Sequence, residues 1–272
     1  MFNKLINKMI NSIGYEIQKF NKFIKKMIKK FIKKMINSLG YEIQKIRTEN
    51  SEYLNFQHFL ALYFSKISLD DFFFIQIGAN DGKTNDPIYN FVLSYNLSGI
   101  LIEPQEYVFE KLKQNYRDNN NLTFENVAIS NKDGYQKMYK VKESYQKIFT
   151  NATGIYATGI SSFNKDHLKK NLKMKKIFFK KNDYIEEINV ETLTFKTLLQ
   201  KYKIKKIDLL QVDVEGFDFE IIKMIDFNRF SPSLINYESK ILNVIDQIKC
   251  EKYLQSKGYT SFRHGGDTCA FK

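Results

Sequence analysis

The chain has 272 residues, of which 43% are hydrophobic and 15% aromatic, and its formal net charge is +13. A chain of this length and apolar content can bury the core of one α/β domain with an appended segment, which excludes wholesale disorder. The two cysteines and three histidines lie far apart in the sequence, without the ligand spacing of a zinc site. Few cysteines and no signal peptide predict a cytoplasmic location.

Much of the positive charge lies in residues 1–46, which contain eleven lysines and two glutamates. Residues 8–19 recur at 34–45 with one substitution, so this segment contains a tandem duplication. Between the copies, residues 23–36 alternate apolar residues and lysines with the spacing of an amphipathic helix. We therefore expect basic amphipathic helices in the N-terminal segment.

Three interpretations of residues 1–50 stay open. The leading one is a helix in the plane of an anionic membrane, on the inner face of the cytoplasmic membrane. The others are a helix that pairs in a homo-oligomer and a tail without a role. Apolar runs in the chain are too short for a membrane span. Arginine, which phosphate and base recognition favour, occurs only four times, so we expect no nucleic-acid partner.

From residue 51 to residue 272 the chain alternates predicted helices and strands. Helices are predicted at 52–66, 87–95, 106–116, 194–203 and 219–225, and strands at 72–78, 99–103, 122–129, 137–141, 188–193, 207–212 and 233–237. Residues 259–262 and 268–271 have the pattern of an antiparallel hairpin. The segment 143–183 is expected to be irregular and to cover a bound acceptor. This order predicts an α/β fold with a doubly wound, Rossmann-like sheet.

Polar residues follow the predicted strands at their carboxyl ends, where open α/β sheets bind ligands. A Gly-x-x-x-Gly turn, Gly78–Gly82, follows the first strand. Glu103 ends the second strand, where a carboxylate can accept both hydroxyls of a ribose. Together these features predict a bound nucleoside. We expect them to converge on one crevice with residues 126–128, residues 213–216 and Glu238.

The charge of the first turn distinguishes between nucleosides. Its sequence, Gly78-Ala-Asn-Asp-Gly82, lacks the central glycine of a dinucleotide turn and contains Asp81. A carboxylate there repels phosphate but suits the ammonium and sulfonium groups of S-adenosylmethionine, so the turn favours this donor over NAD. Structural interpretations stay open: the glycines can serve the turn alone, Glu103 can be a solvated strand end, and Asp213 or Glu215 can cap a helix.

Five segments, in this order, resemble the FkbM family of methyltransferases: residues 75–87, 99–105, 125–130, 209–216 and 236–238. Position 239 is serine, where the resemblance leads us to expect histidine. The resemblance covers residues 70–272 and implies the class I methyltransferase fold. It also implies O-methylation with S-adenosylmethionine, and we expect the acceptor to be a sugar hydroxyl of a bacterial surface glycan or its precursor.

The resemblance also implies roles for individual residues. Those implied to bind the donor are Gly78, Asn80, Asp81, Gly82, Glu103, Asn126 and Ala128. Asp213, with Glu215 or Glu238, is implied to orient or deprotonate the acceptor hydroxyl. A divalent metal on Asp213 and a base role for His264 stay open.

Two other functions stay open beside O-methylation. The chain could be a non-catalytic, membrane-associated adapter that binds the donor. It could also be a nucleic-acid methyltransferase, although the fourth parallel strand ends in Asp213-Val-Glu-Gly216 and lacks the Pro-Pro-aromatic pattern of enzymes that modify base amino groups. Lysines in the 143–183 segment face either an anionic glycan or water; they are Lys165, Lys169, Lys170, Lys173, Lys175 and Lys176.

Overall fold

The computed structural model describes residues 55–146, 160–174 and 184–272. The predicted N-terminal helices and parts of the 143–183 segment lie outside the described residues, so the division of the chain at residue 50 stays a prediction. Residues 53–272 form one compact unit. Within the described part of the chain, no helix has the length and hydropathy that a membrane span requires.

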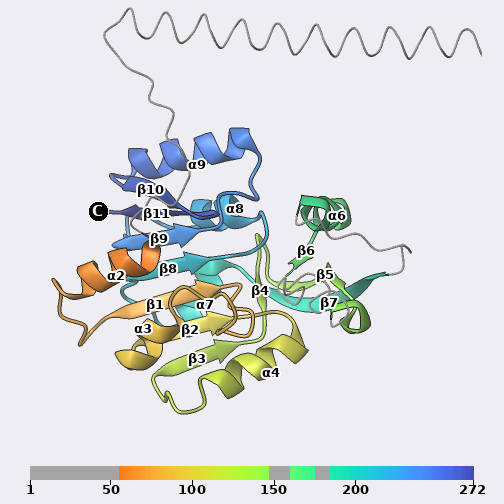
Figure 1. Ribbon diagram of the computed structural model, residues 1–272, viewed down its shortest axis with the longest axis horizontal. Helices are drawn as coiled ribbons and strands as arrows, with labels where there is room; N and C mark the ends of the chain where they lie inside the picture. The colour runs from red at the N-terminus through yellow and green to blue at the C-terminus, as the bar shows by residue number, and fades with distance from the viewer. Residues whose placement is uncertain (1–54, 147–159, 175–183) are drawn as a thin grey trace, which may run out of the picture. The chain divides into compact units, whose positions relative to one another are not determined.

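The main sheet has seven strands in the order β10-β11-β9-β8-β1-β2-β3 (Figure 1). Its parallel strands are β1 (Phe73–Ile77), β2 (Ser98–Ile102), β3 (Leu122–Glu125), β8 (Leu209–Val212) and β9 (Leu234–Tyr237). The hairpin of β10 (Thr260–His264) and β11 (Asp267–Phe271) joins this sheet, with β11 antiparallel to β9. The predicted fold, a doubly wound sheet with a C-terminal antiparallel hairpin, is confirmed.

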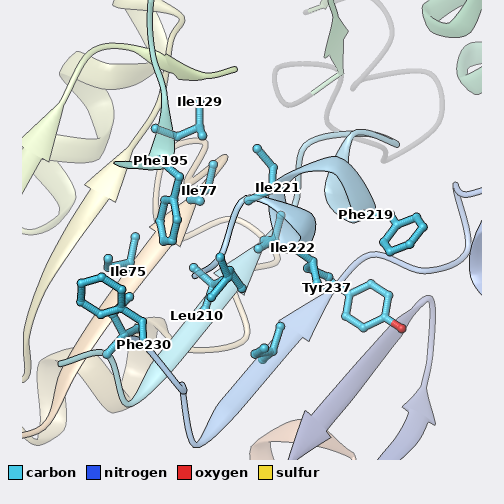
Figure 2. Close-up of a cluster of buried hydrophobic side chains, with 14 of the residues drawn as sticks. Ile75, Ile77, Ile129, Phe195, Leu210, Phe219, Ile221, Ile222, Phe230 and Tyr237 are labelled. Carbon is cyan, nitrogen blue, oxygen red and sulfur yellow. The ribbon is translucent and has the colours of Figure 1, made fainter. Parts of the chain in front are cut away.

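Helices cover both faces of this sheet. One face packs against α2 (Phe56–Phe64), α3 (Tyr89–Ser94) and α4 (Glu106–Asn115). The other face packs against α7 (Phe195–Lys201), α8 (Asp218–Lys223) and α9 (Val244–Ser256). Figure 2 shows the second core, in which isoleucines of β1 and Leu210 of β8 lie beside α7 and α8. Because both faces are covered, the parallel strands are mostly apolar.

A second sheet, which the sequence did not predict, lies beyond the carboxyl ends of the parallel strands (Figure 1). Its strands, in the order β4-β7-β5-β6, are β4 (Ala128–Ile129), β7 (Ile185–Leu193), β5 (Gly134–Val141) and β6 (Ser161–Ser162). The predicted strand 122–129 was wrong as a single element. After Glu125 the chain leaves β2, and Ala128 pairs with Thr192 of β7 instead.

The prediction that residues 143–183 are irregular was also wrong in part. Helix α6 (Lys165–Met174) follows β6 in this segment. Leu168 and Leu172, one helical turn apart, are buried with Val141 and Ile160 in a cluster separate from both main cores. This small core explains why a lysine-rich segment forms a helix, because two well-placed leucines suffice to fix it to the second sheet.

Candidate active site

A cavity of about 410 Å³ lies where β1, β2 and β8 end, and β5, β6 and α6 contribute its opposite wall. This volume is within the range of about 300–1,000 Å³ that is usual for small-molecule sites. Its described lining contains four carboxylates and neither lysine nor arginine. The carboxylates are those of Asp86, Glu103, Asp213 and Glu215. A chain of strongly positive net charge thus has an acidic cavity, which favours a cationic ligand.

The turn after β1 is fixed between the two neighbouring strands. The backbone N–H groups of Gly78 and Ala79 donate to the carbonyl of Ile102 in β2, at 3.0 and 2.9 Å. Gly78 has φ +79°, and a Cβ at this position would lie 1.8 Å from the carbonyl oxygen of Asp213. Glycine is required here because the turn contacts the end of β8 directly. The predicted turn residues Gly78 and Asn80 both line the cavity.

Glu103, the predicted ribose acceptor, lines the cavity and is 4% exposed. Its Oε2 accepts from the N–H of Asn80 at 3.1 Å, and its Oε1 accepts from the N–H of Gln105 at 2.9 Å. Burial raises the pKa of Glu103 to about 7, and the charge of Asp213 adds to this effect while the backbone hydrogen bonds oppose it. The Gln105 side chain also donates to this carboxylate, so the lone pair that remains can accept a ligand hydroxyl.

Asp81 and Gly82, predicted to bind the donor, do not line the cavity among the described residues. The carboxylate of Asp81 closes its own loop, where it accepts from the N–H of Lys83 at 3.0 Å and from the N–H and hydroxyl of Thr84 at 2.7 and 2.6 Å. Gly82 packs against α4, so that a Cβ would lie 2.4 Å from Leu112 Cδ1. Both residues shape the loop rather than contact the cavity.

Asp86, a lining residue that the sequence did not single out, follows in the same loop. Its Oδ2 accepts from Gln76 Nε2 at 2.7 Å, and its Oδ1 accepts from the N–H groups of Ile88 and Tyr89 at 2.8 and 3.1 Å. Burial raises the pKa of Asp86 to about 6, and the charge of Asp81 raises it further, whereas these hydrogen bonds lower it. A glutamine inside an otherwise apolar strand was the available signal, because a buried amide needs partners.

The residues predicted to border adenine differ in their positions. Ala128 lines the cavity beside Val127, Ile129 and Met138, which form an apolar wall suited to a flat base. Asn126 lines a separate cavity instead, and its Nδ2 donates to the backbone carbonyl of Glu103 at 2.8 Å. Asn126 therefore holds the end of β2 in place.

The predicted catalytic carboxylates lie together. One carboxylate oxygen from each of Asp213, Glu215 and Glu238 lies within 4.8 Å of the others, although Glu238 does not line the cavity in the described structure. Oxygen ligands of this kind can hold a divalent cation. Asp218, which the sequence did not single out, fixes the cluster: its carboxylate accepts from the N–H groups of Gly216 and Glu238, both at 3.1 Å. Burial, with the charge of Asp213, raises the pKa of Asp218 well above its usual value.

His264, the alternative base, lies outside the described cavity lining. Its Nε2 lies 2.7 Å from Asn236 Oδ1, and its ring stacks on Phe56 with a centroid separation of 5.3 Å. Burial lowers the pKa of His264. Ser239, at the position where histidine was expected, is buried and bonded to the hairpin through Thr268 Oγ1 at 2.8 Å. Both side chains serve the junction of β9 with the hairpin.

His167, on α6, is a lining histidine that the sequence analysis missed. Its Nε2 is buried and has no hydrogen-bond partner among the described residues. The ring lies against Gly216, where a Cβ would come within 2.4 Å of Nε2. Asn164 Oδ1 caps the helix by accepting from the N–H of His167 at 3.1 Å. Because α6 had not been predicted, nothing indicated that this histidine would lie against the turn after β8.

Comparison with known proteins identifies the family. A family model described as the methyltransferase FkbM domain matches residues 76–260. Curated protein sequences give no significant match. Solved structures that are similar include a precorrin-6y C5,15-methyltransferase from Geobacter metallireducens GS-15, which is 12% identical over 82% of this chain and 93% of that chain, with a TM-score of 0.38.

Two further structures are similar at the same level. The METTL16 methyltransferase domain is 12% identical over 87% of this chain and 74% of its own, with a TM-score of 0.42. A human methyltransferase 10 domain containing protein is 11% identical over 88% and 92%, with a TM-score of 0.37. These similarities are too low to indicate a reaction. The family match, however, covers more than half of the chain. The chain belongs to the FkbM family of methyltransferases, whose class I fold implies S-adenosylmethionine as the methyl donor.

Proposed function

We propose that this chain is an S-adenosylmethionine-dependent O-methyltransferase that acts on a sugar hydroxyl of a bacterial surface glycan or its precursor. The observation that carries the proposal is the acidic cavity, whose described lining has four carboxylates and no basic lysine or arginine. A dinucleotide would place its pyrophosphate against these carboxylates without a counter-charge. A sulfonium donor has the complementary charge.

The residues present fit this donor. The closely packed Gly78 turn and the buried carboxylate of Glu103 suit the ribose, and the apolar wall of Ala128 and Met138 suits the adenine. When bound, the donor supplies a methyl group that its sulfonium makes electrophilic. The protein supplies position and removes the acceptor proton.

The opposite wall fits a hydroxylated acceptor. Ser161, Ser162 and Asn164 contribute hydroxyl and amide groups from β6 and the start of α6, and such groups exchange hydrogen bonds with sugar hydroxyls. Asp213 is exposed and lines the cavity, and we assign its carboxylate the role of proton acceptor. Glu215 and Glu238 lie beside it and orient the hydroxyl, or hold a divalent metal with Asp213.

Two other functions compete with this proposal. A donor-binding adapter needs the Gly78 turn and Glu103 but not the carboxylates at the end of β8. A nucleic-acid methyltransferase needs basic side chains for the phosphate backbone, which the described cavity lining does not provide. The adapter is therefore the alternative to exclude.

Mass spectrometry of surface glycans tests the proposal. We expect glycans from the producing bacterium to lose one methyl group per modified sugar when this chain is deleted, and to regain it with the wild-type chain. The Asp213→Asn variant, produced at the same level, should not restore it. Glycans that are identical with and without the chain would contradict the sugar acceptor, and full restoration by Asp213→Asn would contradict the role of Asp213.

We also propose that residues 1–46 bind an anionic membrane surface. Each lysine near such a surface contributes about 1 kcal/mol before screening, and this segment carries eleven. Removing residues 1–46 should abolish sedimentation with phosphatidylserine vesicles and leave donor affinity unchanged. Continued sedimentation of the shortened chain would contradict membrane binding, and a change in its oligomeric state would favour helix pairing.

A further inference from the structure

The polar groups at the β1 side of the cavity include hydrogen-bond acceptors that lack a donor. Gln76 lies in β1, lines the cavity and is 4% exposed. Its Oε1 is buried and has no hydrogen-bond partner in the described structure. Asn80, which lines the same cavity from the turn after β1, has a buried Oδ1 that also lacks a partner there. Buried acceptors without donors are destabilising, so two of them in one cavity wall indicate a ligand that donates.

Asp86 determines which end of the Gln76 amide faces away from it. An ionised carboxylate only accepts hydrogen bonds, and Asp86 Oδ2 lies 2.7 Å from Gln76 Nε2. The amide must therefore present its NH2 group to Asp86 and keep its carbonyl oxygen for another partner. Asp86 Oδ1 is already occupied by the N–H groups of Ile88 and Tyr89, whereas Oδ2 has one further lone pair.

These three side chains together offer acceptors and one negative charge. The chemical group that matches them is a primary ammonium, which carries a positive charge and three donors. A hydroxyl would satisfy one acceptor and leave the carboxylate without a counter-charge. The neighbouring Lys83 does not supply the charge, because its Nζ lies over the Tyr89 ring, 5.8 Å from the centroid, and Lys83 is absent from the described lining.

We propose that Gln76, Asn80 and Asp86 form the binding site for the ammonium group of the donor's amino-acid moiety. This inference rests on the proposed function and deepens it, since it assigns the ribose and the ammonium to different carboxylates, Glu103 and Asp86. It also transfers to Asp86 the role that the sequence suggested for Asp81, whose carboxylate is occupied within its own loop.

Calorimetry with two neutral-sulfur ligands isolates the ammonium. The probes are S-adenosylhomocysteine and its desamino analogue, in which hydrogen replaces the α-amino group. Wild-type full-length protein should prefer S-adenosylhomocysteine by about tenfold to a hundredfold, because the analogue forfeits a charged hydrogen bond. Asp86→Asn should reduce this preference to about threefold or less, with little change in affinity for the analogue.

Two further variants control this experiment. Asp81→Asn makes the same chemical change in the same loop and should keep the wild-type preference. Gln76→Leu removes the unpaired Oε1 without altering charge and should lower the preference by about threefold to tenfold. Because asparagine keeps a carbonyl oxygen for Ile88 and Tyr89, the start of α3 should persist in Asp86→Asn, which a thermal melt verifies.

The outcomes separate this inference from the proposed function. If wild-type protein binds S-adenosylhomocysteine and Asp86→Asn keeps the full preference for the amino group, the ammonium site is wrong and donor binding stands. An equal loss of both ligands in Asp86→Asn would also overturn the site, because it would reveal a general structural effect. If wild-type protein binds neither ligand, the donor assignment fails and this inference fails with it.

Discussion

The two walls of the cavity are built differently. The wall from the main sheet consists of strand ends and a turn whose N–H groups are bonded to β2. The opposite wall comes from β5, β6 and α6, of which α6 is held by a small cluster that includes Leu168 and Leu172. The proposed ribose and ammonium sites thus belong to the wall from the main sheet, whereas α6, proposed to lie beside the acceptor, has a core of its own. The proposed adenine wall, Ala128 and Met138, lies in the second sheet, so we expect acceptor specificity to change through β6 and α6 without rebuilding the turn after β1.

The strongest test of this difference is Gly78→Ala. A methyl group there would meet the Asp213 carbonyl at 1.8 Å, in addition to the strain of φ +79°. Gly258→Ala is the matched control, since Gly258 has φ +88° with nothing within 4 Å of its Cβ position, and it should lose only about 1–3 kcal/mol. We expect Gly78→Ala alone to lose donor binding, by calorimetry, with a lower Tm than Gly258→Ala. Equal behaviour of the two variants would contradict the fixed turn.

Asp213→Asn should affect transfer far more than donor binding. Loss of a general base lowers a rate by about 10²–10⁴-fold, and asparagine keeps the size of the side chain that it replaces. Methylation of surface glycans in the producing bacterium provides the measurement, with Asp118→Asn as an exposed control. Wild-type methylation by Asp213→Asn would place the proton acceptor elsewhere in the cavity.

Glu103→Gln should weaken donor binding by about tenfold to a hundredfold, because a charged acceptor of the ribose hydroxyls becomes neutral. Calorimetry with S-adenosylmethionine measures the change. Glu110→Gln, on the exposed side of α4, removes the same charge outside the cavity and should have little effect. If both variants bind as tightly as the wild type, Glu103 is a structural residue of the β2 end.

The donor should stabilise the protein more at high pH than at low pH. Burial raises the pKa of Glu103 to about 7 and that of Asp86 to about 6, above ordinary carboxyl values. In the free protein, these two raised pKa values stabilise the folded state, and the stabilisation is complete at a pH below the unfolded pKa of each carboxyl group. It is lost as the pH rises through about 6–7. A cationic donor favours the ionised forms, so its Tm shift should be larger near about pH 8 than near about pH 5.5. An equal or smaller shift at high pH would contradict an acidic donor site.

The sequence predicted the main sheet well because its parallel strands are short apolar runs with polar residues at their ends. Glu103 and Asp213 could be placed on the cavity from this pattern alone, since carboxyl ends of parallel strands share one edge. Parts of β5 and β7 were predicted as strands, at 137–141 and 188–193, but their pairing into a second sheet was not. Their pairing depends on contacts between segments that are distant in the sequence.

The sequence also could not determine whether Asp81 or Asp86 contributes its carboxylate to the cavity. Both lie in one loop, and the direction of each side chain depends on backbone conformations at Asn80 and Asn85, which have φ +49° and +58°. The pairing of Gln76 with Gln211 across β1 and β8 was a usable signal, because polar side chains at matching positions of two buried strands indicate a polar surface.

Calorimetric titration of the full chain with S-adenosylmethionine and with NAD tests the central claim, that the acidic cavity binds a cationic adenosyl donor. We expect micromolar binding of S-adenosylmethionine, lost in Gly78→Ala and weakened in Glu103→Gln, and no heat with NAD. Binding of NAD without binding of S-adenosylmethionine would contradict the account.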